Sequence, residues 1–252
     1  MKINTKIKMK KWLIYLLLSC IILGIWQYFG STSNTARLLL SSPSLVISYF
    51  IQNHFDLLQA TYTTLLEAVS GLAIAICFSF SMMVLCFYRP KLMDYILPIM
   101  ITSQVIPLIV LAPFFIVLMG IGLSSKIAMA ALISFFPIFI NFAQGYKSIS
   151  KNIHELMMVY QAPLKFRIKN VYFPLSMPSI LAGLKISANL AVIGAIVAEF
   201  SGAENGLGKN LYISAIRFEP ELMMSSLFLS MFIGIFFYSL FVIIERRIVR
   251  WI

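Results

Sequence analysis

A few polar side chains stand inside long apolar runs of the 252-residue chain, and they are the first candidates for chemistry. Two of them, Glu67 and Lys185, are ionisable, and three are amides: Gln104, Asn141 and Asn189. An ionisable group within a membrane is costly and is a functional candidate by default. Lys185 could attract an anionic solute, or it could instead reach the interface or a helix-end carbonyl. The amides could line a translocation path or hydrogen-bond neighbouring helices.

The depths of the two charged residues in the membrane indicate whether they can meet, and three prolines indicate where a translocation path could open. Glu67 falls near the outer end of its apolar run, whereas Lys185 falls about 11 residues, or roughly 16 Å, above the inner end of another. We therefore expect no direct bond between them. Pro98, Pro107 and Pro113 share one apolar run, and they predict kinks or a local opening that could line a path.

The sequence contains partial matches to catalytic and metal-binding motifs, but the required residues do not stand at the required spacing. The G-L-G-K run at 206–209 ends like a phosphate-binding loop, but Ala203 and Asn210 stand where that loop needs Gly and Ser or Thr. The three cysteines lie in apolar runs without a C-x-x-C pair, far from both histidines. We therefore expect neither a metal site nor a disulfide framework. No His, Asp, Glu or Ser groups converge at one depth, so we expect no enzyme, and no cofactor is implied.

The elements that must hold these residues are membrane-spanning helices. The chain is 60% hydrophobic and 12% charged, which leaves too few charges to cover a soluble domain. Its formal net charge of +11 is spread over loops without interleaved aromatics, which argues against nucleic-acid binding. In lipid the backbone must bond to itself, and a core of about 30 Å needs roughly 20 apolar residues per crossing. The sequence predicts an all-α transmembrane protein, a six-helix polytopic bundle in one domain over residues 1–252, with spans at about 12–29, 65–87, 95–119, 127–146, 175–200 and 222–244.

Lysines and arginines indicate the orientation of these spans. With the N-terminus inside, fifteen of them fall in inside segments and four, including Arg37, in outside ones, while Lys185 lies within a span. This bias follows the positive-inside rule and predicts that both termini are cytoplasmic. The first apolar run could be a cleaved signal peptide, but its length and the lack of a small-x-small site favour a retained helix. Segment 30–64 is then a long outside connection that could end in an amphipathic stretch.

The longest inside connection, 147–174, is half apolar and also carries five lysines and arginines. Ile153, Met157 and Tyr160 recur at helical spacing and Pro163 interrupts the pattern, so two short helices with a bend are predicted. A helical and half-apolar loop needs a surface to pack on. It could lie on lipid headgroups as an interfacial basic helix, or it could dock a cytoplasmic partner.

The pattern of this loop resembles the E-A-A-x(3)-G-x(9)-I-x-L-P loop of the membrane subunits of binding-protein-dependent ABC importers. Glu155, the spacing and the final Pro174 are retained, while Gln161 replaces the glycine. A glutamine adopts positive φ less readily than a glycine, so the bend could depend on Pro163 instead. The loop residues that the resemblance assigns to ATPase coupling are Glu155, Leu156, Met157, Gln161, Ala162, Pro163 and Pro174. Glu155 could alternatively be a simple helix cap.

Flanking segments are similar to one branch of these subunits, which serves nitrate, sulfonate, taurine and some vitamin-precursor importers. They read F-F-P-I-F-I-N at 135–141, G-L-K at 183–185, V-A-E-F at 197–200 and G-L-G at 206–208. The resemblance runs from about residue 64 to the C-terminus. In that branch the position of Lys185 is commonly basic, whereas the position of Glu67 is more often basic than acidic.

The resemblance implies a fold of the type I ABC importer permease kind in the bacterial cytoplasmic (inner) membrane. It implies a second permease subunit, which would make a homodimer if this chain is the only one, two cytoplasmic ATPase subunits that hydrolyse ATP, and an extracytoplasmic solute-binding protein. The chain would form the path for a small anionic or vitamin-precursor solute, and loop 151–174 would couple it to the ATPase. The rival is an ion-coupled secondary transporter, but the spans hold few ionisable groups and show no inverted repeat in hydropathy.

Overall fold

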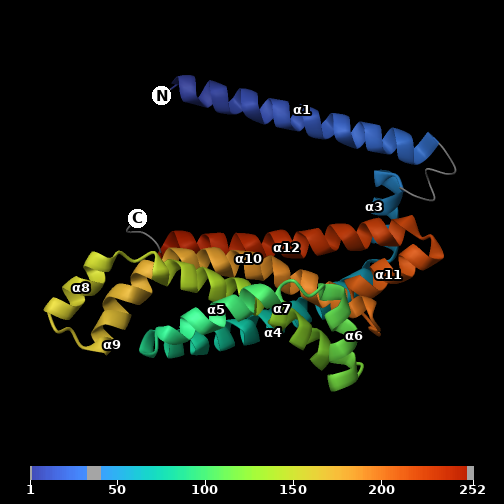
Figure 1. Ribbon diagram of the computed structural model, residues 1–252. Helices are drawn as coiled ribbons and strands as arrows, with labels where there is room; N and C mark the ends of the chain where they lie inside the picture. Colours follow the sequence, from blue (N-terminus) through green and yellow to red (C-terminus); the bar gives the residue numbers. More distant parts are fainter. Residues whose placement is uncertain (1, 33–40, 249–252) are drawn as a thin grey trace. The chain divides into compact units, whose positions relative to one another are not determined.

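The computed structural model describes residues 2–32 and 41–248, and every element in those ranges is helical (Figure 1). The helices are α1 (Lys2–Thr32), α3 (Pro43–Gln52), α4 (His54–Tyr88), α5 (Lys91–Ser103), α6 (Leu108–Met119), α7 (Leu123–Lys147), α8 (Lys151–Val159), α9 (Leu164–Arg167), the π-helix η1 (Ile168–Tyr172), α10 (Phe173–Phe200), α11 (Leu207–Arg217) and α12 (Pro220–Ile248). Arg37 and Arg250, two of the charges used for the orientation, lie outside the described residues.

Four helical stretches are long and apolar enough to cross a membrane. They are α4, α7, the continuous run Leu164–Phe200 and α12, and they contain the predicted spans 65–87, 127–146, 175–200 and 222–244. Leu17–Thr32 and Ile109–Met119 are shorter apolar helices. The protein is thus an all-helical membrane protein, while the count of six spans and the cytoplasmic termini stay predictions.

The third predicted span, 95–119, is not one helix. It divides into α5 and α6, with a break over residues 104–107. Pro107 has φ −59° and ψ 125°, an extended conformation, and a proline disfavours helical geometry at the residue before it. Pro98 and Pro113 lie inside α5 and α6 and end neither helix. Of the three prolines, Pro107 therefore marks the interruption.

The chain folds as two compact units, which are described separately: Met1–Leu58 with Asn210–Phe228, and Gln59–Lys209 with Leu229–Ile252. In the first unit, Trp26 of α1 donates its indole N–H to the carbonyl oxygen of Ser41 at 3.0 Å. The Ser41 hydroxyl donates to Glu221 of α12 at 2.8 Å, and the Trp26 ring lies 5.7 Å from that of Phe228. The start of α3 is thus tied to both α1 and α12.

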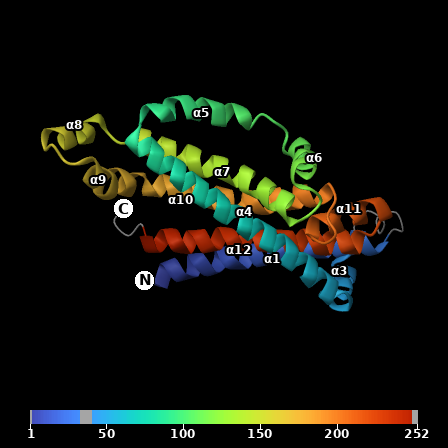
Figure 2. The ribbon, with the colours of Figure 1, turned by 90° about the horizontal axis from the view of Figure 1, so that it is seen from below.

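The second unit is built on the pair α7 and α10, which lie side by side along much of their length in Figures 1 and 2. Glycines allow this approach: a Cβ on Gly183 would lie 2.7 Å from the Pro137 carbonyl oxygen, and one on Gly194 would lie 2.9 Å from the Cα of Ala130. Lipid provides no hydrophobic force between helices, so close backbone packing by small residues is what joins them.

The connection from α9 into α10 also differs from the expected short helix followed by a separate span. Helix α9, η1 and α10 run on without interruption from Leu164 to Phe200, eleven residues before the predicted start at 175. The ring of Pro174 would clash with the carbonyl of residue 170 in a regular α-helix. The wider π turn at Ile168–Tyr172 makes room for that ring, so the helix continues into the loop.

Candidate functional site

Loop 151–174 contains the predicted bend between two short helices, and the turn that makes it is centred on Gln161. The amide N–H of Gln161 donates to the Met158 oxygen at 2.9 Å, and that of Ala162 donates to the Met157 oxygen at 3.1 Å. These two bonds form a Schellman motif at the end of α8, in which the residue at Gln161 is expected to adopt left-handed backbone angles. Gln161 has φ +46°. The glutamine thus adopts the conformation usual for glycine, and Pro163 follows in extended conformation at the N-cap of α9.

Helix α8 exposes apolar side chains beside Glu155. None of its residues is buried, and Val159 and Tyr160 at its end are 79% and 73% exposed. Leu156 and Met158 are exposed as well. Glu155 is exposed and lies beyond the first turn of the helix, so nothing supports the alternative that it is an N-terminal cap. The arrangement offers an apolar patch with one carboxylate to a partner surface.

The opposite side of α8 is held by aromatic contacts to the spans. The Nδ1 atom of His154 lies 3.1 Å from the Tyr172 hydroxyl, and the two rings are 4.8 Å apart. The Tyr146 ring of α7 packs edge-on against both of them, at 5.8 Å from His154 and 5.6 Å from Tyr172. Helix α8 is thus attached to the end of α7 and to η1.

Lys185 is already paired, which the sequence reasoning did not foresee. Its Nζ atom donates to both carboxylate oxygens of Glu245 in α12, each at 2.8 Å. Both side chains are partly exposed. No bond joins Lys185 to Glu67 among the described residues, as the estimate of their depths led us to expect. An anionic solute at Lys185 would have to compete with the Glu245 carboxylate.

The three amides occupy three different environments. Asn141 donates to the Pro137 oxygen of its own helix at 2.8 Å, so it serves the backbone of α7. Asn189 has a buried Oδ1 atom with no hydrogen-bond partner among the described residues, and it lines a shallow cavity against Gly234 and Tyr238 of α12. Gln104 is exposed at the end of α5. The structure does not bring them together into one site.

A cavity opens where the α5–α6 segment breaks. It has a volume of about 340 Å³ and is lined mainly by apolar residues. Gln104 and Ser103 provide polar groups at its α5 side, while Phe136, Pro137 and Leu190 face it from α7 and α10. The cavity thus lies beside the break that precedes Pro107, while its use as part of a path stays a prediction. Its walls are suited to an uncharged organic group rather than to a bare ion.

Sequence reasoning missed a hydrogen-bonded cluster at the end of α10. The Glu199 carboxylate accepts a hydrogen bond from the Thr64 hydroxyl at 2.7 Å and another from the Gly208 amide. The Leu207 amide in turn donates to the Thr64 hydroxyl oxygen at 2.9 Å. These bonds cap the start of α11, where backbone N–H groups lack partners and a negative charge is favourable. Gly206 has φ +139°, and a Cβ there would overlap Glu199, which explains the G-L-G sequence.

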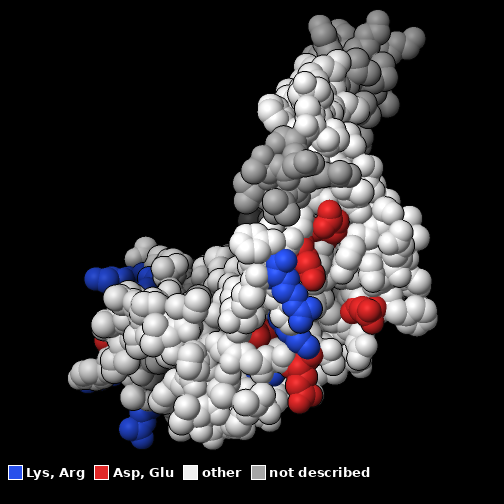
Figure 3. All heavy atoms as spheres, turned by 90° about the vertical axis from the view of Figure 1, so that its right-hand side faces the viewer, with Lys and Arg blue, Asp and Glu red and all other residues white. Residues whose placement is uncertain are grey.

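The surface drawn in Figure 3 is mostly uncharged, and side chains of both signs are visible on it.

Comparison with known proteins supplies further findings. The family model described as "Binding-protein-dependent transport system inner membrane component" matches residues 75–252. A formylaminopyrimidine transport permease protein of Halalkalibacterium halodurans is 31% identical over 218 residues, covering 84% of this chain and 86% of the relative. A riboflavin transport system permease protein of Chloroflexus aurantiacus is 31% identical over 233 residues, covering 92% and 87%. A putative aliphatic sulfonates transport permease protein of Bacillus subtilis is 27% identical over 250 residues, covering 95% and 88%.

One solved structure shows the same fold. An inward-facing MetNI methionine ABC transporter contains a chain that matches with a TM-score of 0.68, at 20% identity, over 79% of this chain and 99% of that one. At this identity the match concerns the fold alone.

Proposed function

Because the chain belongs to the inner membrane components of binding-protein-dependent transport systems, we propose that loop 151–174 couples it to a cytoplasmic ATPase. As a member of that family it is a multi-pass inner-membrane protein and the permease subunit of an ABC importer. Permeases of this family are transport subunits rather than enzymes, and ATP hydrolysis belongs to a separate partner. An extracytoplasmic binding protein would deliver the solute.

The observation that carries the coupling proposal is the two-sided character of α8. One side exposes Leu156, Met158 and Val159 next to Glu155, and the other is attached to the spans through His154. A partner bound to the exposed side would move α7 and α10 through the aromatic contacts, because a short rigid helix transmits a displacement that a flexible loop would absorb. The rival position, flat on lipid headgroups, would leave the carboxylate facing anionic lipid.

The solute then belongs to the class of small anions or vitamin precursors, as do sulfonates, riboflavin and formylaminopyrimidine, for which the relatives are named. The pairing of Lys185 with Glu245 favours vitamin precursors over simple anions, because the cation of the fifth predicted span is occupied. The mainly apolar cavity beside Gln104 suits an organic ring as well. A second copy of the chain, paired as a homodimer, would complete the path.

Co-purification tests the coupling. The tagged chain is extracted in mild detergent with the ATPase encoded beside it, and wild type is compared with Glu155→Arg. We expect wild type to retain the ATPase and the variant to lose most of it, since the substitution reverses the charge beside the apolar patch. The matched control is Asp56→Arg, which reverses an exposed carboxylate in the first turn of α4. Equal retention by all three proteins would overturn the proposal.

A further inference from the structure

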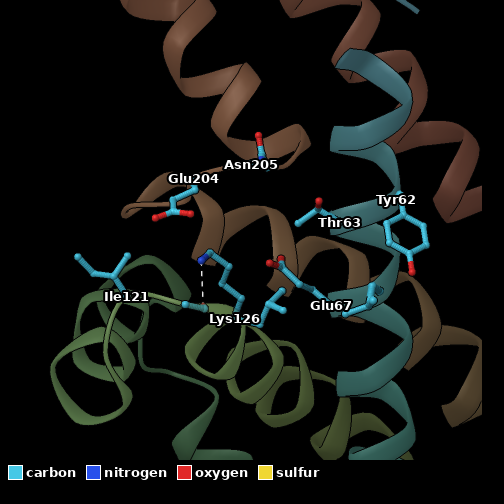
Figure 4. Close-up of a pocket in the computed structure, with 10 residues that line it drawn as sticks. Tyr62, Thr63, Glu67, Ile121, Lys126, Glu204 and Asn205 are labelled. Atoms are coloured by element: carbon cyan, nitrogen blue, oxygen red, sulfur yellow. Dashed lines mark hydrogen bonds between the residues drawn. The ribbon is translucent and has the colours of Figure 1, made fainter. Parts of the chain in front are cut away.

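Two glutamates are buried side by side at the end of α10 that lies away from loop 151–174. Glu67 of α4 is 0% exposed and Glu199 of α10 is 1% exposed, and their carboxyl groups are in hydrogen-bond contact. Figure 4 shows Glu67 extending from α4 toward Lys126 of α7. Both oxygens of Glu67 are buried, so the cavity drawn there does not expose them. The pair has no part in the coupling loop or among the predicted path residues.

The two carboxyl groups differ in the donors around them. One oxygen of Glu199 accepts the Thr64 hydroxyl at 2.7 Å and the other accepts the Gly208 amide N–H. Neither oxygen of Glu67 accepts a hydrogen bond from a described N–H or O–H group. Hydrogen bonds to a carboxylate favour its ionised form, and a buried charge without donors is costly. Glu199 is therefore suited to be the ionised member of the pair, and Glu67 the neutral one.

The contact between the two side chains itself requires a hydrogen atom. An ionised carboxylate can only accept hydrogen bonds, whereas a protonated carboxyl group has one O–H donor. Two ionised carboxylates at this place would also repel each other. A proton on Glu67 removes the repulsion and gives its O–H group a partner in Glu199. The same proton completes the hydrogen bonds of both buried groups.

The charge of the surroundings fits one proton. Lys126 is only 5% exposed and forms no ion pair with either glutamate, since its ammonium group donates to the Gly122 oxygen at 3.0 Å. With one proton on the pair, the two glutamates and Lys126 together carry no net charge. The other ionisable residues that line the adjacent cavity, Glu204 and Tyr62, are exposed to solvent. Lys209 of α11 donates to the Glu204 backbone oxygen.

We propose that Glu67 and Glu199 form a binding site for a single proton, carried by Glu67 as a carboxylic acid that donates to the Glu199 carboxylate. The proton joins α4 to the end of α10 and the start of α11, because Glu199 also accepts the Gly208 amide. Removing the proton leaves two negative charges in one buried place and loosens this junction. The proposal rests on the buried pair alone, and it stands whether or not loop 151–174 binds an ATPase.

Infrared spectroscopy of the full-length chain in lipid nanodiscs tests for the proton directly. A protonated carboxyl group has a carbonyl stretching band that a carboxylate lacks, and glutamate labelled with carbon-13 at the side-chain carboxyl shifts that band and identifies it. At neutral pH we expect this band in wild type and its loss in Glu67→Gln. The matched control is Asp56→Asn, the same change at an exposed position of α4, which should keep the band. A wild type without the band, or a Glu67→Gln variant that retains it, would contradict the proposal.

The pH dependence of stability gives a second, independent readout. A glutamate in the unfolded chain releases its proton at about pH 4.3, so above this pH the folded protein holds one proton that the unfolded chain does not. The stability of wild type must then fall as the pH rises, until the folded protein also releases the proton. Relative to Glu67→Gln, the ratio of folded to unfolded protein should fall about tenfold per pH unit over that range.

The stability measurement is a series of thermal unfolding experiments from mildly acidic to alkaline pH. Glu67→Gln keeps the shape of the side chain and an N–H donor for Glu199 but cannot ionise, so the difference between its unfolding temperature and that of wild type isolates the proton. We expect wild type to lose stability relative to Glu67→Gln as the pH rises, and the loss to end where the infrared band disappears. Asp56→Asn should follow wild type throughout. Parallel curves for wild type and Glu67→Gln would show that the pair binds no proton.

Discussion

Two residues of this protein are of a type that is uncommon for their position, one because of its backbone conformation and one because of its burial. Gln161 adopts the left-handed conformation that a glycine adopts easily, and Glu67 is a buried acidic group beside a second one, Glu199. Each departure has a cost of its own, because a positive φ strains a residue with a Cβ and two neighbouring buried carboxylates repel each other when both are ionised. Both can therefore be examined with single substitutions.

At Gln161, replacement by glycine should stabilise the protein. Positive φ costs a residue with a Cβ about 1–2 kcal/mol, and the greater freedom of glycine in the unfolded chain returns roughly half of that. We expect Gln161→Gly to raise the free energy of unfolding by about 0.5–1 kcal/mol, measured by thermal unfolding in detergent. Gln161→Ala keeps the Cβ and should change nothing. A stabilisation of equal size in the alanine variant would show that the side chain, not the backbone, is responsible.

For Lys185, a double-mutant cycle with Glu245 should reveal a coupled pair. Removing either charge alone leaves the other without its partner in a partly buried place, whereas Lys185→Met with Glu245→Met removes both. We expect the coupling free energy in thermal unfolding to be about 1–2 kcal/mol. Solute uptake should recover in the double variant. Uptake that stays lost there would indicate that Lys185 itself meets the solute.

At the scale of helices, the pairing of α7 with α10 depends on positions that accept no side chain. A Cβ on Gly183 would meet the Pro137 oxygen at 2.7 Å and the Asn141 Cβ at 2.9 Å. We expect Gly183→Ala to destabilise the protein by about 1–3 kcal/mol, because the two backbones must separate. The control is Gly24→Ala in α1, where nothing lies within 4 Å of the added group. The comparison is made by thermal unfolding, and equal stability of the two variants would contradict close packing at Gly183.

Helix positions could largely be read from the sequence, while the way helices end and meet could not. The long spans and the presence of a bend in loop 151–174 could be predicted from the apolar runs and from Pro163, which are local signals, but the left-handed conformation of Gln161 could not. The cluster of Thr64 with Glu199 joins residues 135 positions apart, and no local pattern predicts such a contact. The sequence shows the spacing between Glu199 and the G-L-G run, but only the fold shows that Glu199 caps the helix that begins there. The π turn before Pro174 likewise depends on how α9 continues into α10.

At the scale of the molecule, the predicted orientation in the membrane gives a direct test. With Cys20, Cys77 and Cys86 replaced, a single cysteine is introduced either at Lys151 or at Ser201, both exposed positions. We expect a membrane-impermeant maleimide applied to intact cells to label the cysteine at position 201 and to reach position 151 only after the membrane is opened. The reverse pattern would invert the topology and place α8 away from any ATPase.

The exposed end of α8 would also affect how long the permease survives in the cell before it binds its ATPase. Val159 and Tyr160 stand almost free beside Leu156 and Met158, the kind of surface that chaperones and quality-control proteases recognise in the cytoplasm. A permease made in excess over its ATPase would then be degraded. Synthesis of the permease and the ATPase in matched amounts, as from one operon, would protect the permease from degradation. The surface of α8 that binds the ATPase would then also determine how much permease the cell accumulates.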